Sequence, residues 1–365
     1  MKRRAFMGSA VGGAAVAASA FPTPAIAQGN VEWRMVTTWP KNYPGQGTGA
    51  ERFAKSVADA TDGRLTITVY GAGELVPAFE SFDAVQSGAA EAMHATPYYW
   101  QGKSMAMNFF STVPYGMTTQ ELSAWMKFGG GQELWDELYD GFGLKGFHGG
   151  STGVQMGGWF NKEINSLADI RGLKMRIPGL GGEMMRKLGA TVVNVPVGEI
   201  FPAIQGGSID ATEWVGPFND LTLGLYKVAK YYYWPGVHEP GTEAEITVSK
   251  AAFAELPADV QKIFALATGA EHEAFTAEFN ARNGDALNTL INEHNVELRR
   301  FPNDVLEGFG KASGEVIAQM RDSGDEMTKK IASSFLEHRQ KLMGWSSYGE
   351  FAFMQARALP FDYAS

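Results

Sequence analysis

The stretch QGGSIDATEWVGP, residues 205–217, contains a short expected strand that carries an acid and an indole side by side. Its second half, Ile209 to Val215, mixes β-branched and aromatic residues between a glycine pair and a Gly-Pro stop, which predicts a strand. Successive strand residues point to opposite sides, so we expect Glu213 and Trp214 to project in opposite directions. One of the two side chains can then face a cleft while the other packs behind it and supports its position. The alternative is a buried Trp beside a solvated Glu.

Strands and helices alternate on both sides of this stretch. In the N-terminal half, the pattern predicts strands at 31–37, 64–70 and 90–96, and helices at 47–60, 80–88 and 120–139. Around residues 205–217, it predicts strands at 173–177, 191–195 and 209–215, and helices at 181–188 and 197–205. Such alternation indicates parallel sheet covered by helices. We therefore expect an α/β protein with two lobes.

Two extended runs are expected to connect the lobes. The run from Leu144 to Phe160 is long and glycine-rich at its centre, which favours a crossing over a single sheet strand. Residues 243–249 are extended enough to cross back, so one cleft is expected between the lobes. After Pro257 the chain is helical at 258–294 and 303–343, with a strand at 296–301. The amphipathic tail 346–359 packs either on its own chain or on a second copy.

Residues 1–27 have the pattern of a cleaved export signal. Lys2, Arg3 and Arg4 precede an apolar, Gly/Ala-rich run, and Ala25-Ile26-Ala27 is a small-x-small cleavage site. The Arg3-Arg4 pair indicates the twin-arginine type. The alternatives are an ordinary secretory signal or an uncleaved anchor, but the apolar run is too short to span a bilayer.

The charge and cysteine content limit the classes of partner. Cleavage of the signal removes Lys2, Arg3 and Arg4, so the formal charge changes from −9 to −12. An acidic chain is a poor match for nucleic acid or an anionic membrane, although one arginine can still bind a small anion in a cleft. With no cysteine in the sequence, stability must come from a hydrophobic core, which a chain of this length can form in two lobes.

Two enzyme-like motifs have weak support. GGSTG, residues 149–153, matches the nucleophile elbow of hydrolases, and an exported hydrolase using Ser151 is the alternative from another class of function. The elbow needs a strand, a turn and a helix, whereas an extended crossing follows here. Residues 102–104 resemble the end of a phosphate loop, but Pro97 stands where its first glycine is required. The six histidines show no metal-type spacing, and without cysteine a zinc site is not expected.

Three charged residues favour binding of a small anion with a cation. Arg176 lies at the end of a predicted strand, where a guanidinium can hold a carboxylate with two hydrogen bonds; the alternative is a surface Arg in a salt bridge. An anion among Arg176, Glu213 and Glu239 would leave a net charge of −2. A cation must therefore bridge them, or a Glu must be protonated or point away. Oxygen atoms of Glu213, the Gln155 amide and backbone carbonyls suit Ca²⁺ or Na⁺.

Aromatic residues follow the predicted strand 90–96. In open α/β sheets, ligands bind outside the carboxyl ends of the strands, so we predict that Tyr98 and Trp100 wall the cleft. The alternative is that these rings belong to the core. Residues 231–234, with sequence YYYW, are the candidate wall on the other lobe.

Together, these features resemble the DctP family of periplasmic solute-binding proteins of TRAP transporters, and within it the 2-oxo acid (pyruvate-type) and lactate binders. The resemblance covers essentially the whole mature chain. Its motifs are GAGELVP at 71–77, STGVQMGGWF at 151–160, LKMR at 173–176, IDATEWVGP at 209–217 and YYYWPG at 231–236. One departure is Val237-His238-Glu239-Pro240, where an aromatic pair is expected before the Glu.

The resemblance implies a fold of the periplasmic-binding-protein type with an interlobe ligand cleft, a long helix spanning both lobes and a C-terminal helical extension. The first lobe would hold residues 28–150 and about 241–276, and the second 151–240 and about 277–335. Residues 336–365 would form a helical segment exchanged in a homodimer.

The resemblance also implies a function in transport rather than catalysis. The protein would capture a small 2-oxo or 2-hydroxy monocarboxylate with a metal cation, Ca²⁺ or Na⁺, in the periplasm and deliver it to TRAP permease subunits. Arg176 would bind the carboxylate; the residues implied around the metal are Gln155, Glu213, Trp214 and Glu239. Gln155, Trp214, Tyr98 and Trp100 would also contact the substrate. A dicarboxylate, a sugar acid or an aromatic acid remains an alternative ligand.

Overall fold

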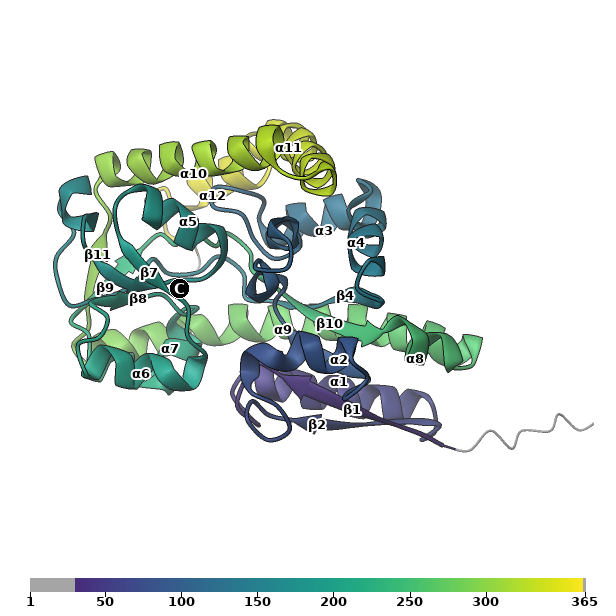
Figure 1. Cartoon of the computed structure of the whole chain (residues 1–365). Helices are drawn as coiled ribbons and strands as arrows, with labels where there is room; N and C mark the ends of the chain where they lie inside the picture. The colour runs from purple at the N-terminus through teal and green to yellow at the C-terminus, as the bar shows by residue number, and fades with distance from the viewer. Residues whose placement is uncertain (1–29, 364–365) are drawn as a thin grey trace, which may run out of the picture.

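The computed structural model describes residues 30–363 (Figure 1). The expected export signal, residues 1–27, lies outside the described residues, as do the last two residues of the expected C-terminal segment. Among residues 30–363, no helix combines the length and apolar character needed to cross a membrane.

The first lobe is built on a five-stranded sheet in the order β2-β1-β3-β10-β4. β1, β2 and β3 are parallel, and β10 runs antiparallel to both of its neighbours, β3 and β4. The strands are β1 (Val31–Thr37), β2 (Leu65–Tyr70), β3 (Ala92–Ala95), β4 (Leu144–Ser151) and β10 (Glu243–Ser249). The accompanying α-helices are α1 (Gln46–Ala60), α2 (Ser81–Gln86), α3 (Thr119–Phe128), α4 (Gly131–Asp140) and α8 (Lys250–Glu255).

The second lobe contains a six-stranded sheet in the order β11-β9-β5-β8-β6-β7. Its strands are β5 (Gly158–Phe160), β6 (Lys174–Arg176), β7 (Thr191–Val193), β8 (Ala211–Thr212), β9 (Tyr231–Trp234) and β11 (Glu297–Arg300). The α-helices are α5 (Gly179–Lys187), α6 (Val197–Gln205) and α7 (Pro217–Leu223). Short 3-10 helices are η1 (Ala78–Glu80), η2 (Pro97–Trp100), η3 (Met105–Phe110), η4 (Leu167–Ile170) and η5 (Leu225–Lys227). The predicted α/β class is confirmed.

The predictions for residues 209–215 and 231–234 differ from the structure. β8 ends at Thr212, so Glu213 and Trp214 lie in the segment that follows it, not within a strand as predicted. The chain turns there because Pro217 begins α7 and the Asp220 carboxylate accepts a hydrogen bond from the Val215 N–H at 3.2 Å. The predicted wall at 231–234 is β9, where Tyr232 is buried and stacks on Trp159 with ring centroids 4.0 Å apart. Its aromatic residues therefore belong largely to the core.

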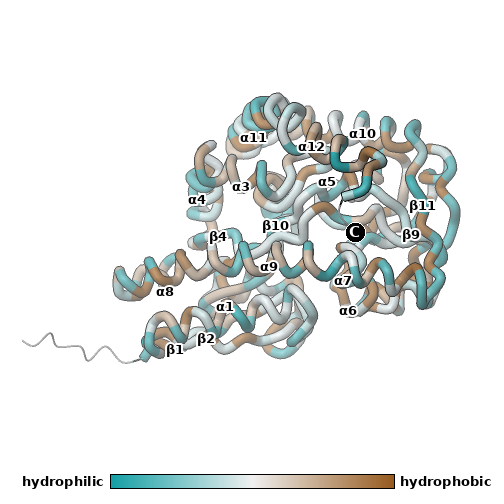
Figure 2. The backbone as a smooth tube through the Cα atoms, turned by 180° about the vertical axis from the view of Figure 1, so that it is seen from behind, coloured by the Kyte–Doolittle hydropathy of each residue, from teal (hydrophilic) through white to brown (hydrophobic). Residues whose placement is uncertain are grey.

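Helix α9 (Ala258–Asn292) crosses both lobes. Its 35 residues extend about 52 Å. It packs on α1 and β4 of the first lobe and on α7 of the second, and in Figure 2 it runs across the back of the molecule. A Cβ atom on Gly150 would lie 2.5 Å from the Phe275 ring of α9. Gly150 in β4 therefore permits the close approach of this helix.

The chain returns to the first lobe after α10. α10 (Asn303–Ser323) packs on α5 of the second lobe, and the chain then enters α11 (Glu326–Ser346), which packs on α3, α4 and η3 of the first lobe (Figure 1). Ile331 and Phe335 of α11 are buried with Trp125 and Phe109 of the first lobe. Residues 326–335, which the sequence placed with the second lobe, therefore pack on the first. α12 (Glu350–Arg357) ends the described helices, and all of its side chains are partly or fully exposed.

Candidate functional site

The chain crosses between the lobes at residues 152–157 and 235–242, which lie side by side. The predicted crossing at 243–249 is wrong, because those residues form β10 in the sheet of the first lobe, and the predicted crossing at 144–160 is limited to the residues between β4 and β5. The Gly236 N–H donates to the Gln155 carbonyl at 3.0 Å, and the Gln155 N–H donates to the Glu239 carbonyl at 3.1 Å. A Cβ atom on Gly236 would come within 2.3 Å of the Gln155 carbonyl oxygen, so this contact requires glycine. The crossings thus bring Gln155 and Glu239 together.

Arg176 is fully buried at the end of β6. Its Nη1 forms an ion pair with the Glu213 carboxylate and donates to the Glu213 backbone carbonyl at 3.2 Å, while Nε donates to the Val195 carbonyl at 3.3 Å. The guanidinium lies 5.3 Å from the centre of a Trp214 ring, a cation–π distance. Among residues 30–363, its Nη2 has no hydrogen-bond partner. The two N–H groups of Nη2 are therefore available to an anion.

Glu213, His238 and Glu239 form a buried group whose donor atoms lie within 4.8 Å of one another. Burial raises the pKa of Glu213 to about 7, against the opposing charge of Arg176. Burial, with the nearby Glu213 charge, raises the pKa of Glu239 to about 8. Burial lowers the pKa of His238, whose Nε2 lies 3.4 Å from Glu213 Oε2. Two ionised carboxylates are unfavourable here unless a cation or a proton accompanies them.

A hydrogen bond made by its nitrogen orients the Gln155 side-chain amide. Nε2 donates to Thr152 Oγ1 at 3.0 Å, and, in the part of the chain that the structure describes, Oε1 is buried without a partner. A neutral amide oxygen and the Glu213 and Glu239 carboxylates are oxygen ligands of the kind that hard cations prefer. The chemistry of these side chains fits Na⁺ or Ca²⁺.

A cavity of about 20 Å³ lies between the lobes. Its wall includes Trp39, Tyr98, Tyr99, Gln155, Trp214 and Thr242. Tyr98 thus lies where the sequence analysis expected it. Trp100 faces the core of the first lobe instead, where its indole N–H donates to Glu245 Oε1 at 2.5 Å. The prediction that Trp100 walls the cleft is therefore wrong, and the alternative, a core residue, is correct. The reason is that only one side of the short helix η2 faces the cleft.

The lobes contact each other through residues that sequence reasoning missed. The Trp214 indole N–H donates to the hydroxyl of Tyr43, a residue of the first lobe, at 3.0 Å. Asn219 Nδ2 donates to the Pro44 carbonyl at 2.8 Å. Tyr43 and Pro44 precede α1 and carry no local motif. His238 was identified only as a departure from the family pattern, although its position next to Glu239 was a usable signal.

The family profile of bacterial extracellular solute-binding proteins, family 7 (DctP), matches residues 35–323. The chain belongs to the DctP family. It is therefore a solute-binding component of a transporter and not an enzyme.

Relatives of this DctP protein have named ligands. It is 42% identical over 324 residues to the monocarboxylate 2-oxoacid-binding periplasmic protein of Nostoc sp. strain PCC 7120, covering 89% of this chain and 88% of the relative. It is 40% identical to a TRAP periplasmic solute-binding protein of Pseudoalteromonas atlantica solved with bound sodium and pyruvate, with a TM-score of 0.88 over 91% of this chain and 100% of the other.

A third relative is a TRAP solute-binding protein of Bordetella bronchiseptica, solved as a mixed-occupancy dimer with calcium and picolinate in one active site. It is 36% identical, with a TM-score of 0.88 over 90% of this chain and 97% of the other. These similarities confirm the predicted two-lobed binding-protein fold of the DctP chain.

The DctP chain has no nucleophile elbow at Ser151. Ser151 is the last residue of β4, and an extended crossing, not a helix, follows it. Its buried hydroxyl shares a 2.6 Å hydrogen bond with Thr119 and accepts one from the Gly153 N–H at 3.3 Å. The side chain therefore secures the end of the strand, and the hydrolase alternative has no structural basis.

Proposed function

We propose that this DctP-family protein binds a small 2-oxo monocarboxylate of the pyruvate type, together with Na⁺ or Ca²⁺, and delivers it to a TRAP membrane permease. Two buried atoms that have no hydrogen-bond partner within residues 30–363 carry the proposal: Arg176 Nη2, a donor, and Gln155 Oε1, an acceptor. One suits a carboxylate and the other a cation. The ligands named for the Nostoc and Pseudoalteromonas relatives have this combined chemistry.

Each residue has a distinct task in this proposal. Arg176 binds the ligand carboxylate, and Trp214 holds the guanidinium in place through its ring face and its hydrogen bond to Tyr43. Gln155, Glu213 and Glu239 hold the cation, which neutralises charge and orients the ligand oxygens. We include Trp214 in the metal site because it directly follows Glu213, a proposed metal ligand, in the chain.

The charge balance suits either cation. Burial raises the pKa of both Glu213 and Glu239, so a proton or a cation must accompany the pair of acids. With Glu239 protonated and Glu213 paired with Arg176, Na⁺ balances one ligand carboxylate. With Glu239 ionised, Ca²⁺ balances Glu239 and the ligand carboxylate together.

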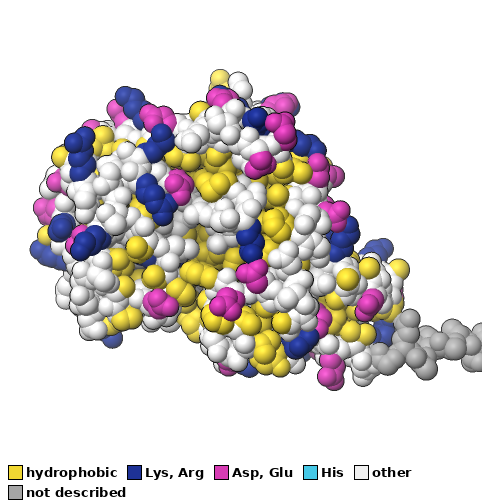
Figure 3. Space-filling view, in the orientation of Figure 1, with side chains coloured by type: hydrophobic (Ala, Val, Ile, Leu, Met, Phe, Trp, Pro, Cys, Tyr) yellow, Lys and Arg dark blue, Asp and Glu magenta, His cyan; other side chains and the backbone are white. Residues whose placement is uncertain are grey.

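Binding requires the lobes to separate. The cavity of about 20 Å³ has room for about one water molecule. A ligand larger than water therefore enters an open form, and the Tyr43–Trp214 hydrogen bond re-forms on closure. Hinge closure around the ligand is the signal that the permease would recognise. On the face in Figure 3, charged side chains of both signs lie around hydrophobic side chains near the line between the lobes.

The setting of this function is the periplasm, to which residues 1–27 would direct the chain by a cleaved signal of the twin-arginine type. The support is the sequence pattern of those residues and the extracellular character of the family.

A ligand survey tests the proposed function. Calorimetric titration of the mature protein with pyruvate, lactate, malonate, gluconate and benzoate, in buffer with Na⁺ and Ca²⁺, should give the tightest binding for pyruvate. The reason is that a 2-oxo group adds an oxygen ligand to the cation beside the carboxylate. Preference for malonate, gluconate or benzoate over pyruvate would replace the proposed ligand class.

The homodimer belongs to the same proposal. The C-terminal segment exposes large apolar side chains, among them Trp345 at 66%, Phe351 at 60% and Phe353 at 61% exposure. Such a patch is typical of a protein interface. The dimer of the Bordetella relative supports a second copy of this chain as the partner.

The double variant Phe351→Ser/Phe353→Ser should be monomeric at concentrations where the mature protein is a dimer, measured by light scattering after size-exclusion chromatography. Losing two buried aromatic contacts per subunit costs at least about 3 kcal/mol. Phe128→Ser, at a side chain exposed by 89% on α3, is the matched control and should stay dimeric. A mature wild-type protein that is monomeric would refute the dimer.

A further inference from the structure

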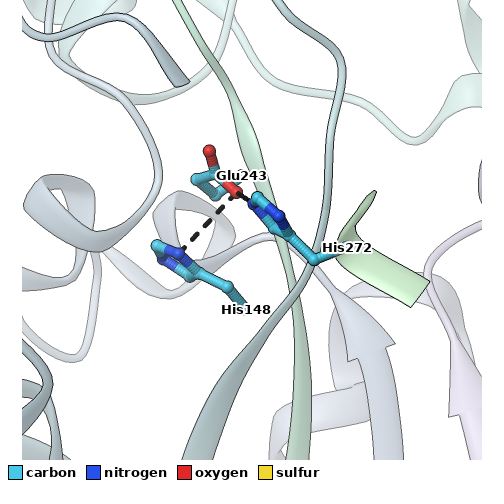
Figure 4. A group of neighbouring side chains, drawn as sticks. All are labelled: His148, Glu243 and His272. Atoms are coloured by element: carbon cyan, nitrogen blue, oxygen red, sulfur yellow. Dashed lines mark hydrogen bonds and ion pairs between the residues drawn. The ribbon is translucent and has the colours of Figure 1, made fainter. Parts of the chain in front are cut away.

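A second group of metal-ligating side chains lies in the first lobe. His148 on β4, Glu243 on β10 and His272 on α9 have donor atoms within 4.8 Å of one another. Figure 4 shows both imidazoles pointing toward the same oxygen of the Glu243 carboxylate. This group uses none of the residues assigned to the pyruvate and Na⁺ or Ca²⁺ site, although Glu243 also borders the interlobe cavity.

The spacing of the donor atoms is close to that of a zinc site. His272 Nε2 lies 2.7 Å from Glu243 Oε2, and His148 Nδ1 lies 3.7 Å from the same oxygen. Ligand atoms about 2.0–2.1 Å from a tetrahedral Zn²⁺ are about 3.3 Å apart. The two observed distances lie on either side of this value, each within about half an ångström, and the two imidazole donors lie within 4.8 Å of each other.

His148 is oriented by a backbone group. Its Nε2 lies 3.0 Å from the carbonyl oxygen of Phe110, which only accepts hydrogen bonds, so Nε2 carries a hydrogen. In the neutral ring, the Nδ1 lone pair then faces the Glu243 carboxylate, and these two acceptors repel each other unless a cation lies between them. Metal-ligating histidines regularly donate their other ring N–H to a backbone carbonyl in this way.

Burial and access also suit a bound cation. The Glu243 side chain is fully buried, and within residues 30–363 its Oε1 has no hydrogen-bond partner. His148 and His272 have side chains 11% and 16% exposed, and both line a pocket of about 420 Å³. The pocket offers a route from solvent and space for a water molecule as the fourth ligand.

We propose that His148, Glu243 and His272 bind a divalent transition-metal ion, with Zn²⁺ as the ion that this two-imidazole, one-carboxylate set favours over Na⁺ or Ca²⁺. Imidazole nitrogen suits Zn²⁺, whereas the harder cations prefer oxygen alone. The ion joins two sheet strands to the long helix. β4 and β10 lead directly into the two crossings between the lobes, so the ion strengthens the first lobe where the hinge begins.

The test is calorimetric titration of the metal-stripped, full mature protein with Zn²⁺. His148→Gln and His272→Gln should each weaken Zn²⁺ binding by at least about tenfold, because each removes one of three protein ligands. His338→Gln on α11 is the matched control, and His238→Gln tests whether Zn²⁺ binds the interlobe site instead. Circular dichroism verifies that each variant is folded. Zn²⁺ at about 100 times its Kd should also raise the Tm of the wild type by roughly 4 °C.

Three results would overturn the proposal. The first is a wild-type protein that does not bind Zn²⁺. The second is unchanged Zn²⁺ affinity in both folded variants, His148→Gln and His272→Gln. The third is loss of Zn²⁺ binding in His238→Gln alone, which would place the ion between the lobes. If Zn²⁺ has no effect but the two variants change the pH dependence of Tm, the group is a proton-sharing network and not a metal site.

Discussion

Pyruvate affinity should fall by about 10² to 10⁴ when Arg176 is replaced with glutamine, because two charge-assisted hydrogen bonds, worth about 1.5–3 kcal/mol each, are lost. The effect is large because Arg176 is fully buried, so water replaces neither bond. Calorimetric titration of the mature variant with pyruvate, in buffer with Na⁺ and Ca²⁺, measures the change.

The control for this variant must separate binding from folding. Arg176→Gln leaves the buried Glu213 carboxylate without its cation, which by itself destabilises the protein. The double variant Arg176→Gln/Glu213→Gln removes both charges and should still bind pyruvate at least about 100-fold more weakly than the wild type. Lys174→Gln, at an exposed position on the same strand, should bind as the wild type does. Pyruvate affinity within threefold of wild type in a folded Arg176 variant would contradict the site.

Removal of the cation is the second large effect. In buffer without Na⁺ and with divalent ions chelated, pyruvate affinity should fall by about 10³-fold. The reason is that the ligand carboxylate and an ionised acid of the site, ~4 Å apart with no cation between them, repel each other by about 4 kcal/mol at an effective dielectric of 20. Adding back Na⁺ or Ca²⁺ should restore binding. The measurement is pyruvate titration in choline buffer before and after each addition.

Gln155→Leu tests whether the Gln155 side chain contributes to binding of the cation. It deletes the buried amide oxygen without changing the charge, so a higher Ca²⁺ concentration should be needed to restore pyruvate binding. Gln205→Leu, at the exposed end of α6, should require the same Ca²⁺ concentration as the wild type. Pyruvate affinity that is indifferent to Na⁺ and Ca²⁺ in the wild type would remove the cation from the mechanism, while leaving the role of Arg176 intact.

Much of the architecture could be predicted because its signals are local. The strand Val31–Thr37 and the helix Val197–Gln205 are confirmed residue for residue, since hydrophobic period and flanking breakers define both. The long helix α9 has few interruptions and was likewise predictable. β8 was predicted too long, because β-branched and aromatic residues after Thr212 serve packing and turn formation instead of a strand.

The candidate site shows where this reasoning ends. The sequence pattern predicts that the glycines at 149–150 lie at the centre of a crossing, yet they lie in β4, and Gly150 gives room to Phe275 of α9. Trp100 was expected in the cleft, and its indole N–H is bound to Glu245 in the core. The spacing of the histidines in the sequence indicates no metal site, whereas the structure brings His148 and His272 to the same carboxylate, that of Glu243 (Figure 4).

By itself, the sequence determined the α/β class, the helical C-terminal third and the strand that carries Arg176. Each depends on residues within one turn or a few strand positions of each other. Only the tertiary structure decided that Arg176 pairs with Glu213, that Gln155 lies beside Glu239, and that the histidines of β4 and α9 meet one carboxylate of β10. The reason is that these contacts join segments far apart in the chain, whose distances are set by packing and leave no period or spacing in the sequence.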